Sequence, residues 1–393
     1  MKIISVNAGS SSLKFTLFEM DTKDVLISGL FERIGIAGSR YVIKYKGEKL
    51  VEEVPLETHT DAANILLKKL VELKVVNSLE EIDGVGHRAV QGGDDYTESV
   101  IIDDAVIEGL KRFSPLAPLH NPANILGINA FKEALPNTPM VAVFDTAFHQ
   151  SIPVENYIYA VPYEWYQENN VRRYGFHGTS HRFITKTISE VLNNDHLKII
   201  NCHLGNGSSL AAIKDGKCID TSMGFTPLAG IVMGTRAGDI DASIIPYIMK
   251  ARNMTIEEVE SVLNKNSGFL GISGRSSDNR DIESGVADGD ERCILTQNMF
   301  INSVVSYIAK YFVELGGCDV LCFTAGIGEN GIGVRKAIVD KLACLGIYID
   351  DAKNDVRGKL TEISREDSKV KVYLVPTDEE LMIAMDTLEL ISK

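Results

Sequence analysis

Two short segments of similar composition occur far apart in this chain, and each follows an apolar run. Asn7 to Lys14 (Asn-Ala-Gly-Ser-Ser-Ser-Leu-Lys) follows Ile3 to Val6, and Gly205 to Leu210 (Gly-Asn-Gly-Ser-Ser-Leu) follows Leu197 to Leu204. Each pattern predicts a strand, a tight turn and a second strand. One such turn is usually only structural, although glycine and serine also suit it to binding an anion. Two of them predict a duplicated domain that holds one polyphosphate between its copies.

The length and charge of the chain restrict its class. With 393 residues, 45% of them hydrophobic and 24% charged, the chain fits a soluble globular protein of two domains, with three as the alternative. No apolar run approaches the about 18 residues of a membrane helix, and the N-terminus has no signal-peptide pattern. The net charge of −14 argues against nucleic-acid binding. An anionic substrate would therefore depend on local cations.

The cysteines indicate a reducing compartment. None of the six forms a Cys-x-x-Cys pair, and most lie in apolar patterns. We therefore expect free buried thiols in a cytoplasmic protein, and no zinc site.

The first part of the chain mixes strand and helix patterns. A helix is predicted from Asp61 to Leu73, with Thr60 or Asp61 as N-cap. Residues 84–90 and 140–144 are predicted to be buried strands that end beside Gln91 and Asp145. The ends of such strands are where ligands usually bind in α/β sheets.

The second part of the chain repeats the mixture of strand and helix patterns found in the first part. A hairpin over 198–213 precedes helices near 241–250, 255–264 and 291–315, the last with Asp290 as N-cap, and a strand at 320–324. A strand at 370–375 precedes a C-terminal helix from about Asp378. The fold class expected is α/β, with two domains whose mixed sheets face a cleft.

Nine motifs in order along the whole chain resemble those of the acetate kinase family. They span Val6–Phe15, His87–Gly93, Phe144–His149, Tyr174–His181, His203–Gly207, Met223–Leu228, Met233–Arg236, Phe323–Asn330 and Pro376–Glu380. The resemblance implies two duplicated ribonuclease-H-like domains of the actin/Hsp70/sugar-kinase type around a central cleft. It places domain I at 1–150 plus 382–393, on the acyl and γ-phosphate side. Domain II, at 151–381, would bind the nucleotide and form a homodimer.

The resemblance implies reversible, direct in-line phosphoryl transfer from ATP to acetate, which gives ADP and acetyl phosphate. Arg88 would hold the acetate, while His177 and Arg236 would stabilise the phosphoryl group in transfer. Asp145 occupies the family's acid/base position. Because acetate is already ionised at neutral pH, we expect Asp145 to orient an arginine or a metal-bound water instead.

The resemblance also assigns nucleotide and metal positions. The metal, Mg²⁺ or Mn²⁺, would be held by Asn7 and Glu379. The nucleotide positions are Ser10, Ser12, Lys14, His203, Leu204, Gly205, Asn206, Gly207, Asp278, Asn279, Arg280, Gly326, Ile327, Gly328, Glu329 and Asn330. Asn279 replaces the family's aromatic residue, so we expect relaxed choice among purine nucleotides. Gln91 and Asp378 depart from the usual histidine and asparagine.

The acyl pocket implied by the resemblance is small and apolar, with Val90, Leu119, Phe176 and Pro227. One methylene in such a pocket is worth only about 1–3 kcal/mol. A kinase that prefers propionate or butyrate therefore remains an alternative. A nucleotide-switch ATPase of the actin or Hsp70 kind is a further alternative, but it would not need Arg88, His177 and Arg236.

Overall fold

The computed structural model describes residues 1–118 and 120–393, which form two compact units. Unit 1 comprises Met1–Gln150 and Asp378–Lys393, and unit 2 comprises Ser151–Thr377. The C-terminal helix α15 (Glu379–Ile391) packs on strands of unit 1. The chain therefore returns to unit 1 at Asp378, earlier than the predicted position 382.

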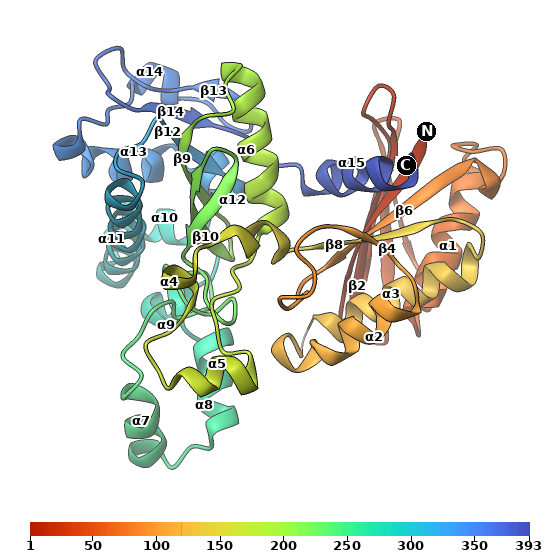
Figure 1. Ribbon diagram of the computed structural model, residues 1–393, viewed down its shortest axis with the longest axis horizontal. Helices are drawn as coiled ribbons and strands as arrows, with labels where there is room; N and C mark the ends of the chain where they lie inside the picture. Colours follow the sequence, from red (N-terminus) through yellow and green to blue (C-terminus); the bar gives the residue numbers. More distant parts are fainter. Residues whose placement is uncertain (119) are drawn as a thin grey trace. The chain divides into compact units, whose positions relative to one another are not determined.

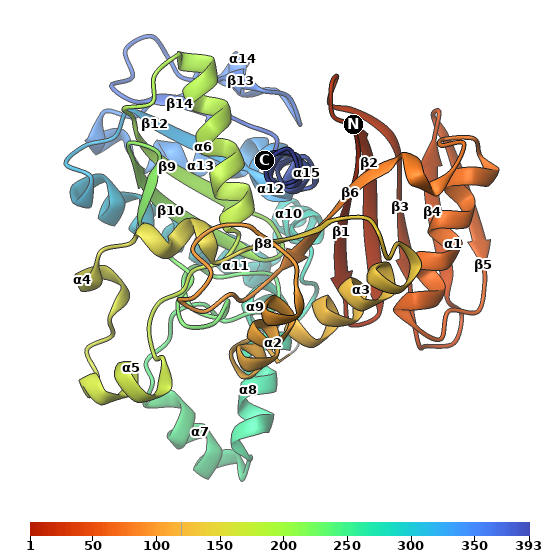
Figure 2. The same ribbon diagram turned by 45° about the vertical axis from the view of Figure 1, so that its right-hand side comes forward.

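Unit 1 is an eight-stranded mixed sheet with helices on both faces (Figures 1 and 2). Helices α1 (His59–Glu72) and α3 (Asn121–Ala134) cover one face, and α15 covers β1, β6 and β8 on the other. Helix α2 (Asp104–Arg112) packs beside α3. The strands, in the order β5-β4-β3-β2-β1-β6-β8-β7, are Glu48–Glu53, Arg40–Tyr45, Asp24–Glu32, Ser12–Glu19, Lys2–Gly9, Ile82–Ala89, Met140–Phe144 and Val100–Ile101.

Unit 2 is a six-stranded mixed sheet between helices α6 (Gly178–Leu192) and α11 (Glu291–Glu314) (Figure 1). Side chains alternate along β9, so Ile200 and Cys202 join the apolar core with α11, and Asn201 and His203 face α6. The strands, in the order β11-β10-β9-β12-β14-β13, are Lys217–Thr221, Ser208–Lys214, Lys198–Leu204, Val320–Thr324, Lys371–Leu374 and Thr361–Glu362.

The two sheets repeat one topology, as the paired turns predicted. In each unit three antiparallel strands (β3-β2-β1 and β11-β10-β9) continue into two parallel strands (β6-β8 and β12-β14). The first hairpin turns between Gly9 and Ser12, and the second between Leu204 and Ser208. Both predicted hairpins and the mixed α/β class are confirmed.

The predicted N-cap of α1 was wrong. Thr58 caps the helix, because its hydroxyl accepts from the Asp61 main-chain N–H and the Asp61 carboxylate accepts from the Thr58 N–H. Asp290 caps α11 as predicted. The remaining helices are α4 (Val154–Tyr157), α5 (Tyr163–Asn169), α7 (Ile244–Arg252), α8 (Ile256–Lys265), α9 (Gly268–Ser273), α10 (Asn279–Ala287), α12 (Ala325–Asn330), α13 (Ile332–Asp340) and α14 (Asp351–Asn354).

Among the described residues, no helix combines the length and the apolar character that crossing a bilayer requires.

The contact of α15 with β6 depends on glycine at position 86. A Cβ on Gly86 would lie 2.6 Å from Ile383 Cγ2, so Gly86→Ala must push α15 away from the sheet. We expect urea denaturation to show a loss of about 1–3 kcal/mol in the free energy of unfolding. Gly333→Ala is the control, because a Cβ there meets nothing within 4 Å. Equal stabilities of the two variants would contradict this packing.

Candidate active site

A two-point ion pair joins the ends of two parallel strands in unit 1. Arg88 on β6 donates from Nε to Asp145 Oδ1 at 3.0 Å and from Nη2 to Asp145 Oδ2 at 2.6 Å. The Asp145 carboxylate is buried directly after β8, with 1% of its surface exposed. Both of its oxygens therefore accept from Arg88, and the planar guanidinium is held in one orientation.

Two further predicted residues lie at the same strand ends. Asn7 on β1 accepts from Arg88 Nη1 at 3.3 Å through its Oδ1. Glu379, the first residue of α15, interacts electrostatically with Arg88 and Asp145. Burial raises the pKa of Glu379 to about 7; Arg88 opposes this rise, while Asp145 adds to it. Unit 1 thus gathers one cation and three oxygen-bearing side chains.

Asn121 and Asn124 at the start of α3 hold this arrangement, and sequence reasoning missed them. Asn124 accepts from the Val90 N–H at 3.1 Å and donates to the Ala8 carbonyl at 3.0 Å. One buried amide therefore ties the first Gly/Ser turn to the end of β6. Asn121 accepts from the Gln91 N–H and donates to the Gln91 carbonyl in the same way.

The serines and lysine predicted to face the γ-phosphate lie at the first turn. Ser10 and Lys14 are exposed to solvent and Ser12 partly so. Lys14 pairs with Glu380 of α15. Asp378 caps α15 by accepting from the Leu381 N–H at 2.9 Å, a bond that an asparagine would also make.

In unit 2, His177 and Arg236 converge on the second Gly/Ser turn. A Cβ on Gly207 would lie 3.4 Å from both terminal nitrogens of Arg236 and 3.6 Å from His177 Nε2. Arg236 also donates from Nη1 to the Pro227 carbonyl at 3.0 Å. His177 caps α6 in a left-handed conformation, with φ of 57°. The absence of a side chain at Gly207 keeps the space beside these groups open.

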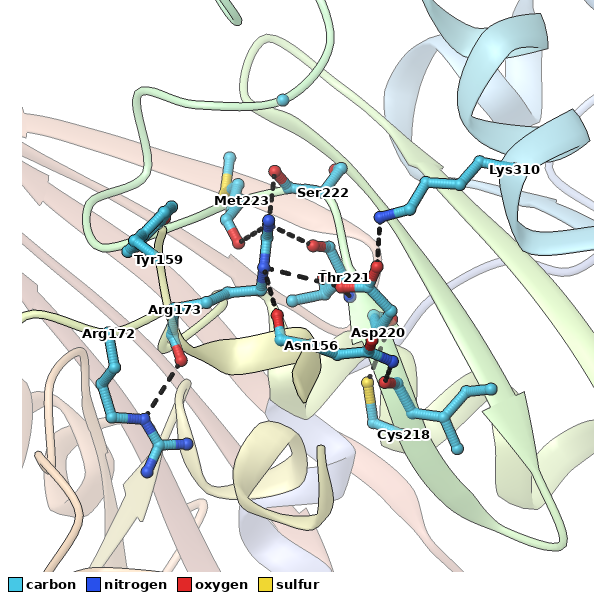
Figure 3. A network of polar contacts seen from close by, with 12 residues as sticks. Asn156, Tyr159, Arg172, Arg173, Cys218, Asp220, Thr221, Ser222, Met223 and Lys310 are labelled. Atoms are coloured by element: carbon cyan, nitrogen blue, oxygen red, sulfur yellow. Dashed lines mark hydrogen bonds and ion pairs between the residues drawn. The ribbon is translucent and has the colours of Figure 1, made fainter. Parts of the chain in front are cut away.

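The loop that leads to His177 is tied to strand β11 by Arg173 (Figure 3). Arg173 donates from Nη1 to the Thr221 carbonyl at 2.7 Å and pairs with the buried Asp220. Asp220 also pairs with Lys310 of α11. Sequence reasoning missed Arg173, because most of its partners are main-chain carbonyls, which no motif records, and Asp220 lies far from it in the sequence.

A cavity of about 670 Å³ in unit 2 contains many of the predicted nucleotide residues. Of these, Gly205, Asn206, Asp278, Asn279, Arg280, Gly326, Ile327 and Asn330 line it. Ser277, Glu283, Gly331 and Arg357 also line it, and none of these was a predicted site residue. Arg280 is paired with Asp278 at 2.6 Å, so its charge is partly neutralised at this wall.

The other predicted nucleotide residues of unit 2 do not line this cavity. Leu204 is fully buried in the apolar core, and Gly328 allows α12 to pack against Phe323. The Glu329 carboxylate accepts from the main-chain N–H groups of Ala325 and Thr377. The His203 ring stacks on the His177 ring, with 4.2 Å between the ring centroids. These contacts give each residue a positioning role, and their contact with a nucleotide stays a prediction.

The residues predicted to line the acyl pocket belong to both units. Val90 and Phe176 are buried and Pro227 is partly buried, and Leu119 lies outside the described residues. Val90 belongs to unit 1, and Phe176 and Pro227 belong to unit 2.

The raised pKa of Glu379 makes stability depend on pH. Between its ordinary value of 4.5 and about 7, the folded protein keeps a proton that the unfolded chain has released. Raising the pH through this window therefore lowers the free energy of unfolding. In metal-free buffer, we expect Glu379→Gln to make this fall less steep, and the control Glu98→Gln, at an exposed position, to leave it unchanged. Parallel pH curves for wild type and Glu379→Gln would contradict the shift.

Comparison with known proteins gives one consistent family. The sequence profile of the acetokinase family matches residues 2–385. An acetate kinase from Treponema denticola is 55% identical over 396 residues, covering 100% of both chains. The crystal structure of Porphyromonas gingivalis acetate kinase has a TM-score of 0.96 at 44% identity, covering 100% of both chains. A propionate kinase structure from Francisella tularensis has a TM-score of 0.94 at 42% identity, covering 99% of each chain.

Proposed function

The chain belongs to the acetokinase family, and we propose that it transfers the γ-phosphoryl group of ATP directly to acetate, giving ADP and acetyl phosphate. The observation that carries this proposal is the Arg88 guanidinium, held at two points by the buried Asp145 at the strand ends of unit 1. A guanidinium fixed in this way is suited to a planar carboxylate substrate. A nucleotide switch that transfers phosphate to water has no need of it.

The physical difficulty of this reaction is the approach of two anions. A carboxylate must attack a phosphoryl group whose charge spreads over its oxygens, so positioning and fixed positive charge matter more than covalent help. Arg88 neutralises the acceptor. Arg236 and the His177 ring, which meet at the Gly207 turn, donate to the phosphoryl oxygens as charge develops on them.

Asp145 serves as a positioning residue for Arg88 in this proposal. Both of its oxygens accept from the guanidinium, and acetate has no acidic proton to lose at neutral pH. Its carboxylate keeps the guanidinium plane fixed while the substrate binds to the remaining N–H groups.

The residues near Arg88 fit a hard divalent cation. Asn7 Oδ1 and the Glu379 carboxylate are the oxygen donors that Mg²⁺ and Mn²⁺ accept, and phosphate oxygens and water would complete the shell. No group of three or more His, Cys, Asp or Glu side chains in the described part of the chain is placed to hold a metal. A site with few protein ligands is what a nucleotide-borne Mg²⁺ requires. The ion would neutralise phosphate charge, and a negative Glu379 would hold it.

Phosphorylation of propionate, as an additional activity, is the second candidate. The similarity to a propionate kinase over 99% of the chain favours this activity, because acetate and propionate would contact the same apolar residues. Assembly as a homodimer through unit 2 and a cytoplasmic location follow from the resemblance and are proposed with the activity.

Trapping of the product with hydroxylamine tests the activity. Wild-type protein with ATP, Mg²⁺ and acetate should give acetyl hydroxamate, and release of ADP without hydroxamate would contradict the proposal.

We expect Asp145→Asn to lower kcat/KM for acetate about 10- to 100-fold, because a hydrogen bond to a charged group is worth about 1.5–3 kcal/mol. The exposed Asp24→Asn is the control. A normal Mg²⁺ dependence with a displaced pH–rate profile in Asp145→Asn would indicate a proton-transfer role instead.

The nucleotide prediction rests on Asn279 in the wall of the unit 2 cavity. Asparagine offers less apolar surface to a purine ring than an aromatic side chain, so the base should be poorly discriminated. We expect kcat/KM for ATP and GTP to lie within about tenfold, since one lost apolar contact is worth about 1–3 kcal/mol. A strong preference for ATP over GTP would contradict this, and Asn279→Phe should restore selectivity.

A further inference from the structure

A chain of buried hydrogen bonds ends on the ring of His177. Asn201 on β9 contacts His181 Nδ1 through its Nδ2 at 2.8 Å. His181 Nε2 contacts Ser209 Oγ at 2.8 Å, and the same oxygen lies 2.9 Å from His177 Nδ1. Asn201, His181 and Ser209 are each fully buried. The chain therefore reaches His177 from the interior, on the ring edge that carries Nδ1.

The fold places these residues together without a contiguous motif. Ser209 pairs with His203 across the β9–β10 hairpin, so it shares the face of β9 that carries Asn201. His177 and His181 are four positions apart at the start of α6, which covers this face. One serine hydroxyl of the second Gly/Ser hairpin thus lies within hydrogen-bonding distance of both rings.

With both rings neutral, the donors and acceptors along this hydrogen-bonded chain alternate in one of two ways. Ser209 has one hydroxyl hydrogen, and among the described residues its Oγ lies within hydrogen-bonding distance of the two ring nitrogens. If this buried hydroxyl accepted from both rings, its hydrogen would have no partner, so Ser209 donates to one histidine and accepts from the other. With the Asn201 amide donating, His181 carries its proton on Nε2 and donates to Ser209. Ser209 then donates to His177 Nδ1, and His177 keeps its own proton on Nε2. The opposite amide orientation would leave the buried NH₂ of Asn201 without a partner, which costs more than the unpaired carbonyl oxygen seen here.

We propose that Asn201, His181 and Ser209 are positioning residues that hold His177 as the tautomer protonated on Nε2. This inference rests on the proposed function, in which His177 donates to the phosphoryl group. Nε2 is the ring atom that faces the Gly207 turn, beside the Arg236 guanidinium. The chain therefore presents a neutral N–H donor next to a permanent cation, and it orients the ring before the nucleotide binds.

Asn201→Asp reverses the direction of donation along the hydrogen bonds that lead to His177, and it changes the shape of the side chain little. A carboxylate can only accept, so His181 must carry its proton on Nδ1, and Ser209 must then donate to His181 Nε2. Ser209 accepts from His177 Nδ1, which removes the neutral donor from Nε2. We expect kcat to fall at least about tenfold, and at most by the roughly 10²–10³-fold that loss of one transition-state donor costs. KM for acetate and for ATP should change less than about twofold, because ground-state contacts remain.

Ring-nitrogen NMR on protein labelled with ¹⁵N-histidine reads the tautomer directly. His177→Gln identifies the His177 signal among the eight histidines. In wild-type protein we expect a protonated Nε2 and an unprotonated Nδ1, and in Asn201→Asp the reverse. Protonation on Nδ1 in wild type, or an unchanged tautomer in Asn201→Asp, would overturn the inference.

Two further variants separate this role from a purely structural one. Ser209→Ala breaks the chain at its last link, so it should leave His177 as a mixture of tautomers and lower kcat even if Asn201→Asp does not fold. Thr185→Val is the matched control, because it removes a buried hydroxyl that donates to the His181 carbonyl and leaves the ring chain intact. We expect Thr185→Val to retain wild-type kcat and the wild-type tautomer.

A double-mutant cycle distinguishes failure of this inference from failure of the proposed function. If the chain acts through His177, Asn201→Asp should lose its effect on kcat in the His177→Gln background. An effect that persists there overturns the inference. Full activity of His177→Gln would instead refute the role of His177 in transfer, whatever tautomer NMR shows.

Discussion

The two-point pairing of Arg88 with Asp145 is the interaction on which the account of unit 1 depends. A buried ion pair is a poor way to stabilise a fold, because an apolar pair of similar size often does as well. The proposed carboxylate substrate explains why this pair lies at the strand ends. In the proposed reaction an anionic carboxylate needs a cation whose orientation does not change when the substrate arrives. Asp145 binds the edge of the guanidinium formed by Nε and Nη2 and holds that orientation. The amide of Asn124 extends this rigidity to the first Gly/Ser turn.

In unit 2, a glycine turn, an arginine and a histidine are proposed to bind the phosphoryl group, and they too must be held in a fixed orientation. Its duplicated sheet places Gly207 where the first unit places its own turn, and Arg236 and His177 meet there. The supports are again polar side chains: Arg173 fixes the incoming loop to β11, and the buried Ser209 on β10 contacts the His177 ring. In both units the residues proposed to meet the reactants are held by side chains that have no such proposed role.

Local features of this fold could be predicted from the sequence, and long-range ones could not. Strands β8 and β12 were predicted to the residue, because short apolar runs bounded by polar residues are local signals. The N-cap of α1 was missed because Thr58, Thr60 and Asp61 all suit a cap, and only the structure shows which hydroxyl meets the free N–H. The buried amides of Asn121 and Asn124 were missed because their partners, which include Ala8 and Gln91, lie far from them in the sequence. Motifs predicted which residues meet the substrates, and that role stays a prediction. No motif indicated the residues that orient them.

In the proposed reaction the phosphoryl group passes directly from nucleotide to acetate, stabilised by fixed positive charge and hydrogen-bond donors, and no side chain carries it. The configuration at phosphorus separates this route from transfer through a side chain. With ATP made chiral at the γ-phosphorus by oxygen isotopes, a single in-line displacement predicts acetyl phosphate of inverted configuration. Retention of configuration would require two displacements through a phosphorylated side chain and would contradict the account.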